Sequence, residues 1–202
     1  MWLFCQSEKP IWRALGACLL GAAKTGLGRP EEGLAELDDG IALYQGLRTP
    51  PVYWPLILFV RAGACARSGR PAEGLGFVDE AIAIAETTSG LTLVPELYSL
   101  KGHLLLLLPE ADDARAERAY HRAFEAAGDS GGRMMQLRAA IGLCAAQRER
   151  GDAGDGSELL RGVYARFTEG FTSPDLIEAA EVLGRLSEDA AARRLADNDG
   201  VA

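Results

Sequence analysis

The sequence predicts an all-α protein, a stack of about four helix pairs closed by a C-terminal helix. Two observations lead to this prediction. Ala, Leu, Gly, Glu and Arg dominate the 202 residues and β-branched residues are sparse, a composition that favours helix over strand. In addition, the sequence repeats itself at an interval of 41 residues, and a fixed period of about that length is typical of solenoid proteins.

The repeat is plainest where residues 28–43 are compared with residues 69–84. Nine of the sixteen aligned residues are identical, whereas unrelated sequences would share about one. Both copies carry a small residue at two sites seven positions apart, which is two helical turns, so both sites face one side of a helix. Two weaker copies follow, and the four pairs of positions are Gly33 and Gly40, Gly74 and Ala81, Ala116 and Ala123, and Gly156 and Val163.

Hydrophobic periodicity and turn residues place the helices. Gly28 and Gly69 are expected to end the preceding helix in a left-handed conformation. Pro30 and Pro71 suit the first turn of the next helix, where the missing N–H costs nothing, and Ser173 is expected to cap a last helix. The expected first helices span 10–27, 52–68, 92–108 and 132–150, the second helices 30–46, 71–87, 112–127 and 156–168, and the last helix 174–186.

These elements predict one helical repeat domain at residues 1–186. Residues 187–202 lose the apolar period, and we expect a flexible C-terminal tail there. Each pair is too small to bury its own apolar face, so neighbouring pairs must stack to form a continuous core. Because the first repeat lacks an obvious polar capping helix, residues 1–10 predict exposed apolar surface and self-association through the N-terminal repeat.

The helix pairs resemble tetratricopeptide (TPR) repeats. The resemblance lies in the Gly-Arg-Pro starts at Gly28 and Gly69 and in the small residues seven positions apart, although the period of about 41 residues departs from the usual 34. It implies a right-handed α-solenoid of about four TPR-like helix pairs plus a C-terminal capping helix. It also implies that the first helices line the concave side, and that the domain is a non-catalytic module binding a protein or peptide.

Two stretches resemble a narrower group, the C-terminal helical-repeat region of bacterial adenylate/guanylate cyclases fused to an AAA-type ATPase, and of related large ATPase regulators. Residues 97–106 look like its L-x-x-L-K-G-E-L-L-L stretch, and residues 159–176 look like its closing signature. In that group catalysis belongs to a cyclase domain and ATP binding to an ATPase domain, and this sequence matches neither. The resemblance therefore implies a regulatory fragment or split piece of a signalling protein, without enzyme activity of its own.

Composition argues against several other functions. The net charge of −8 disfavours a nucleic-acid partner. The apolar run at residues 104–108 is too short for a membrane span, and the N-terminus does not read as a signal peptide. The four cysteines form no CxxC pair, which favours buried, reduced thiols and a cytoplasmic protein.

The sequence holds few of the motifs that usually carry chemistry. GxGxxG and HExxH do not occur. His103 and His121 are the only histidines, and neither has a second His or Cys at helical spacing, so both predict ordinary surface or partly buried side chains. Residues 151–158 lack the alternating carboxylates of a calcium loop and predict a turn with a helix cap. We therefore predict no catalytic residue, no metal and no cofactor.

The charges are sorted by helix. The expected first helices and their leading segments hold twelve Lys/Arg against three Asp/Glu, whereas the second helices hold six against nineteen. If the first helices line a groove, that groove is basic and would attract an acidic peptide or anionic ligand. Favourable helix-dipole interactions explain the same pattern without any binding role. The candidate partner-binding residues are Arg13, Lys24, Arg61, Lys101, His103 and Arg138.

Two functions stay open at this point, a protein-interaction scaffold and a small-ligand sensor that binds an effector in the concave groove. An open, shallow groove favours the scaffold, and a deep, partly apolar pocket favours the sensor. Three aromatic residues, Trp12, Tyr53 and Trp54, are either core residues or anchors for a partner.

Overall fold

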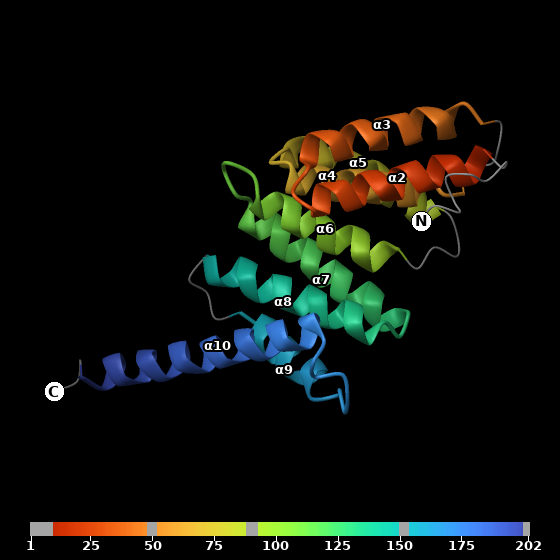
Figure 1. The fold of residues 1–202 in the computed structure, drawn as a ribbon. Helices are drawn as coiled ribbons and strands as arrows, with labels where there is room; N and C mark the ends of the chain where they lie inside the picture. Colours follow the sequence, from red (N-terminus) through yellow and green to blue (C-terminus); the bar gives the residue numbers. More distant parts are fainter. Residues whose placement is uncertain (1–9, 48–51, 88–92, 150–153, 200–202) are drawn as a thin grey trace.

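The structure is a computed structural model, and it describes residues 10–47, 52–87, 93–149 and 154–199. Within these residues the chain forms nine helices and no strand, as the sequence predicts (Figure 1). The helices pack in consecutive pairs, and the last one packs against the fourth pair. They are α2 (Pro10–Gly26) and α3 (Pro30–Gln45), α4 (Trp54–Arg67) and α5 (Pro71–Thr87), α6 (Val94–Leu106) and α7 (Asp113–Asp129), α8 (Arg133–Glu149) and α9 (Gly156–Tyr164), and finally α10 (Pro174–Asp199).

The turns inside the first two pairs have the same geometry, which confirms the repeat. Gly28 and Gly69 adopt left-handed φ angles of 75° and 68°, which favour glycine because it has no Cβ. In each turn the N–H of the next arginine reaches back to a carbonyl of the preceding helix, at 3.0 Å from Arg29 N to Lys24 O and 2.9 Å from Arg70 N to Cys65 O. These bonds satisfy carbonyls that the helix end would leave unpaired.

The predicted small residues lie where helices meet. A Cβ on Gly33 would stand 2.6 Å from the carbonyl oxygen of Gly21, so the backbones of α2 and α3 touch there. Ala81, Ala116 and Ala123 are fully buried at the matching places in the next two pairs. The spacing of seven residues therefore marks the face that each second helix presents to its first helix.

The last two helices end at other residues than the sequence predicts. Helix α9 ends at Tyr164 rather than near residue 168, and α10 continues to Asp199 rather than ending at 186. Residues 190–196 are rich in alanine, which extends a helix without an apolar face to bury. The last turns of α10 project beyond α8 and α9 (Figure 1). The Ser173 hydroxyl, predicted to cap α10, is buried and makes no hydrogen bond within the described residues.

The first helices form the inner layer of the stack. Helix α2 contacts α4, α4 contacts α6, α6 contacts α8, and α8 contacts α10, whereas consecutive second helices make no close contact over the described residues. The layer whose helices lie closer together is the concave one, so the first helices line the concave face, as the resemblance implies. No helix in the described part of the chain combines the length and the apolar character that a membrane crossing requires.

The concave face as the candidate functional site

Two cavities open on the concave face. The first, which we call the apolar cavity, lies between α2 and α4 and has a volume of about 580 Å³. The second, which we call the mixed cavity, lies between α6 and α8 and has a volume of about 430 Å³. The apolar cavity is lined by Trp12, Leu15, Gly16, Cys18, Leu19, Tyr53, Leu56, Ile57 and Val60.

None of the described residues that line the apolar cavity is charged. Helix α2 buries Ala14 and Cys18, and its residues Trp12, Leu15 and Leu19 contribute large apolar side chains to the cavity. Leu19 is 56% exposed and Trp12 is 36% exposed, and the Trp12 ring lies 6.4 Å from that of Tyr53. Large apolar side chains exposed together in a concave surface are typical of a contact site.

The mixed cavity is built around Tyr120, a buried side chain of α7 that also lines the cavity. The ring of Tyr120 lies against two glycines, since a Cβ on Gly102 would stand 2.8 Å from it and a Cβ on Gly142 would stand 2.2 Å from it. Burial raises the pKa of the Tyr120 phenol, so it stays protonated at neutral pH. The two glycines on α6 and α8 therefore make room for a large ring in the core beneath the cavity.

Charged groups of both signs line the rim of the mixed cavity. Arg138 donates two hydrogen bonds to Asp175, at 2.8 and 3.0 Å, and its guanidinium lies 3.6 Å from a carboxylate oxygen of Glu96. The hydrogen bonds from Arg138 lower the pKa of Asp175, whereas burial raises the pKa of Glu96. Desolvation lowers the pKa of His103, so its ring is neutral at pH 7. Glu178 also lines this cavity, so carboxylates outnumber the one cation among the described residues of the rim.

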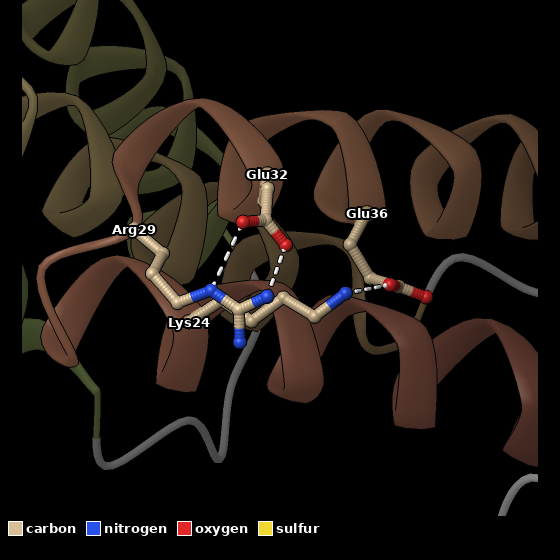
Figure 2. Close-up of polar contacts among 4 residues, drawn as sticks. All are labelled: Lys24, Arg29, Glu32 and Glu36. Carbon is tan, nitrogen blue, oxygen red and sulfur yellow. Dashed lines mark hydrogen bonds and ion pairs between the residues drawn. The ribbon is translucent and has the colours of Figure 1, made fainter.

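Three of the predicted binding cations are engaged with acidic residues of second helices. Lys24 pairs with Glu36 of α3 (Figure 2). Lys101 lies 2.7 Å from a carboxylate oxygen of Asp79 on α5. Each of these ion pairs joins a basic first helix to an acidic second helix, so the two lysines stabilise the stack.

Arg61 is the most deeply engaged of the predicted cations. Only 6% of the residue is exposed, and its guanidinium lies 2.8 Å from Asp38 and 3.5 Å from Glu73. It also donates to the carbonyl of Leu34 at 3.2 Å and lies 5.6 Å from the ring centre of Phe77. Arg61 therefore joins α4 to both α3 and α5 and does not face the concave surface.

Of the six predicted residues, the structure brings His103 and Arg138 together at the mixed cavity. Arg13 is exposed on α2 beside Trp12. The sequence analysis did not predict the apolar cavity, although it named Trp12 and Tyr53 as possible anchors, and both line it. Trp54, the third aromatic, stacks on Tyr44 with ring centres 6.1 Å apart and donates to Glu80.

Comparisons with known proteins support the fold. The structure is similar to crystal structures of a Podospora anserina protein designated a kinesin light chain with nearly identical TPR-like repeats. One of these, a single-residue variant, has a TM-score of 0.70 at 17% identity and covers 96% of this chain and 93% of its own. The other has a TM-score of 0.69, also at 17% identity, with coverages of 95% and 93%. No protein-family model and no curated protein sequence matches the chain. The fold is thus that of TPR-like repeats.

Proposed function

We propose that this chain is a non-catalytic protein-interaction module that holds a partner segment along its concave face, with an apolar side chain of the partner inserted into the apolar cavity. The observation that carries this proposal is the cavity itself, which has a volume of about 580 Å³ and whose described lining residues are all uncharged. TPR-like repeats generally serve protein binding, which agrees with an open surface of this kind.

The proposed partner is a peptide or helix with a large aliphatic or aromatic anchor. Trp12 and Tyr53 offer rigid aromatic walls, the type of residue that dominates binding energy in protein interfaces. The prediction of an acidic partner is now supported mainly by Arg13, because Lys24 and Arg61 are already paired and Arg138 is paired with two carboxylates. We therefore place any acidic group of the partner close to Arg13.

A finer proposal concerns the cellular setting. The stretches at residues 97–106 and 159–176 support a regulatory role in a bacterial cyclase–ATPase signalling system, as a piece of such a protein or a subunit beside it. The unpaired, buried thiols of Cys18, Cys65 and Cys144 support a cytoplasmic location. Co-purification of the native chain with a cyclase or ATPase polypeptide would support this setting, and its presence in a locus without either would argue against it.

The test uses a displayed peptide library selected on the purified full chain. The key variant is Leu19→Glu, which puts a charge into the apolar cavity. The matched control is Leu27→Glu, because Leu27 is 78% exposed at the end of α2 and does not line the cavity. Burial of one large apolar anchor is worth about 2 kcal/mol, so Leu19→Glu is expected to weaken selected peptides roughly thirtyfold or more.

Two results would overturn the proposal. One is a set of selected peptides without any large apolar residue in common. The other is an equal loss of affinity in Leu19→Glu and Leu27→Glu, which would place binding outside the cavity. The selected peptides also test charge, because acidic residues among them should lose part of their affinity in Arg13→Glu.

Self-association and small-ligand sensing are the alternatives. A concentration-dependent dimer in sedimentation that Leu19→Glu abolishes would assign the apolar cavity to a second copy of the chain. The sensor function is favoured by the mixed cavity, where Glu96 is a partly buried carboxylate beside Arg138. Both cavities are open to solvent, which is the arrangement expected for docking of a protein segment.

A further inference from the structure

A cluster of three side chains with metal-binding chemistry lies among α7, α8 and α9, outside the two concave-face cavities. Glu117 and His121 stand one turn apart on α7, so both point to the same side of that helix. Asp155, just before the first residue of α9, completes the cluster. One carboxylate or imidazole atom from each residue lies within 4.8 Å of the other two.

A buried amide holds the two carboxylates in place. Gln147 of α8 is 3% exposed, and its Nε2 donates to Glu117 Oε1 and to Asp155 Oδ1, both at 3.0 Å. Its Oε1 accepts a hydrogen bond of 3.0 Å from the backbone N–H of Gly156. One side chain therefore fixes ligand groups that come from two different helical elements.

The loop before α9 is shaped to reach this amide. A Cβ on Gly154 would stand 2.1 Å from the Gln147 side chain, and a Cβ on Gly156 would stand 2.7 Å from it. Glycine at both positions lets the loop backbone lie against Gln147. The residue between them, Asp155, is thereby brought next to α7.

The Asp155 side chain does not cap helix α9, although an aspartate just before a helix commonly does so. Asp155 is the N-cap residue of α9, yet its side chain makes no capping hydrogen bond to that helix. Its carboxylate faces Gln147 instead, and its Oδ1 lies 3.4 Å from His121 Nε2. The carboxylate is thus directed into the cluster.

His121 also departs from the pattern of the repeat. The offset of 42 residues that aligns Gly74 with Ala116 aligns Asp79 with His121, and the first copy has Asp38 at this place. Both aspartates form ion pairs with the next first helix. In the third copy an imidazole replaces the carboxylate and faces Asp155 instead.

We propose that Glu117, His121 and Asp155 bind a divalent transition-metal ion such as Zn²⁺. One imidazole nitrogen with two carboxylate oxygens suits such ions better than Mg²⁺ or Ca²⁺, which prefer oxygen ligands alone. With bonds of about 2.1 Å, ligand atoms around one ion lie roughly 3 to 4 Å apart, so small side-chain rotations close the site. Asp155 is exposed and the other two are half-buried, which leaves a path for the ion and room for water ligands.

The bound ion joins α7 to the start of α9. These two helices make no close helix-to-helix contact in the described part of the chain, so the ion adds to the link that Gln147 and the His121–Asp155 contact already make. Because the ligands are assembled only in the folded protein, binding stabilises the fold. The site is independent of the concave face, and the proposed function can fail without affecting it.

The test is a calorimetric titration of the full, untagged chain with Zn²⁺, together with thermal unfolding. The variants are His121→Gln and Asp155→Asn, and the matched control is His103→Gln, which removes the other histidine of the chain. We expect His121→Gln and Asp155→Asn to weaken Zn²⁺ binding at least about tenfold, while His103→Gln binds as the wild type does. Zn²⁺ should raise the melting temperature of the wild type and of His103→Gln only.

Cobalt distinguishes this site from a cysteine site. Co²⁺ bound by nitrogen and oxygen gives weak visible bands, whereas thiolate ligands add an intense near-ultraviolet charge-transfer band. Absence of Zn²⁺ binding by the wild type would overturn the proposal, as would a thiolate band or unchanged affinity in His121→Gln. Circular dichroism of each variant shows whether a loss of binding reflects lost ligands or a lost fold, and two variants with native spectra that bind normally would also refute the site.

Discussion

Arg61 provides the sharpest test of how the stack is held together. Truncation to alanine removes the ion pairs with Asp38 and Glu73, the contact with Phe77 and a buried aliphatic stem. The useful comparison is Lys101→Ala in the next junction, where a single lysine that is 24% exposed pairs with a half-exposed Asp79.

The magnitudes follow from what each truncation leaves behind. The side chains of Asp38 and Glu73 are 60% and 32% exposed, so water solvates them when Arg61 is removed and the two pairs are worth only about 1 kcal/mol together. The cation–π contact with Phe77 adds about 1 kcal/mol, and the lost stem packing about 1 to 2 kcal/mol. Arg61→Ala should therefore cost about 3 to 4 kcal/mol of unfolding free energy, against about 1 kcal/mol or less for Lys101→Ala.

Urea unfolding followed by circular dichroism measures both values. Arg61→Met is the matched control, since it keeps most of the stem and loses the charge, and it should cost roughly half as much as the alanine variant. Equal costs for Arg61→Ala and Lys101→Ala would refute the argument from burial. If Arg61→Met instead binds the partner much more weakly but unfolds at the same urea concentration as the wild type, Arg61 contacts the partner directly.

Further predictions concern helix contacts and pH, each measured by urea unfolding. Gly33→Ala should destabilise by about 2 kcal/mol because its Cβ meets backbone atoms, whereas Gly76→Ala, with open space around it, should stabilise by about 0.5 to 1 kcal/mol. The hydrogen bonds from Arg138 lower the pKa of Asp175 in the folded protein. The stability that this contact adds is therefore fully present above pH 3.8, the pKa of an aspartate in the unfolded chain, and is lost as pH falls through the lower folded pKa. Asp175→Asn should accordingly lower the free energy of unfolding at pH 7 and have almost no effect in strong acid. Burial raises the pKa of Glu96, so the free energy of unfolding of the wild type should fall relative to that of Glu96→Gln as pH rises above 4.5. If the difference in unfolding free energy between the two proteins is the same at about pH 4 and pH 7, the predicted direction is wrong.

The helix pairs were predictable because their signals are local. Gly28 lies two residues beyond the end of α2 and Pro30 is the first residue of α3, and the second copy repeats both. The small residues at Gly33 and Gly74 mark a face through helical spacing alone. The end of α10 was missed because alanine-rich residues keep a helix going without the apolar period used to recognise one.

The candidate sites depend on stacking, which the sequence shows less directly. Trp12 and Tyr53 are 41 residues apart, and only the contact of α2 with α4 turns them into walls of one cavity. In the proposed metal site, Glu117 and His121 lie at helical spacing, a pattern that is missed when only His and Cys count as partners of a histidine. Asp155 lies 34 residues beyond His121, and no local pattern connects the two.

The sorting of charges between helices has its main explanation in the junctions of the stack. Asp38 and Asp79 occupy the same place in successive repeats, and each pairs with a cation on the next first helix, Arg61 and Lys101. Basic first helices and acidic second helices are therefore what this junction requires, with no partner involved. Cations used between helices do not line a groove, so the surface left for a partner is set by the apolar cavity and by the mixed cavity, whose rim holds one already paired cation, Arg138. Shape and apolar contact, more than net charge, should then decide which partner binds.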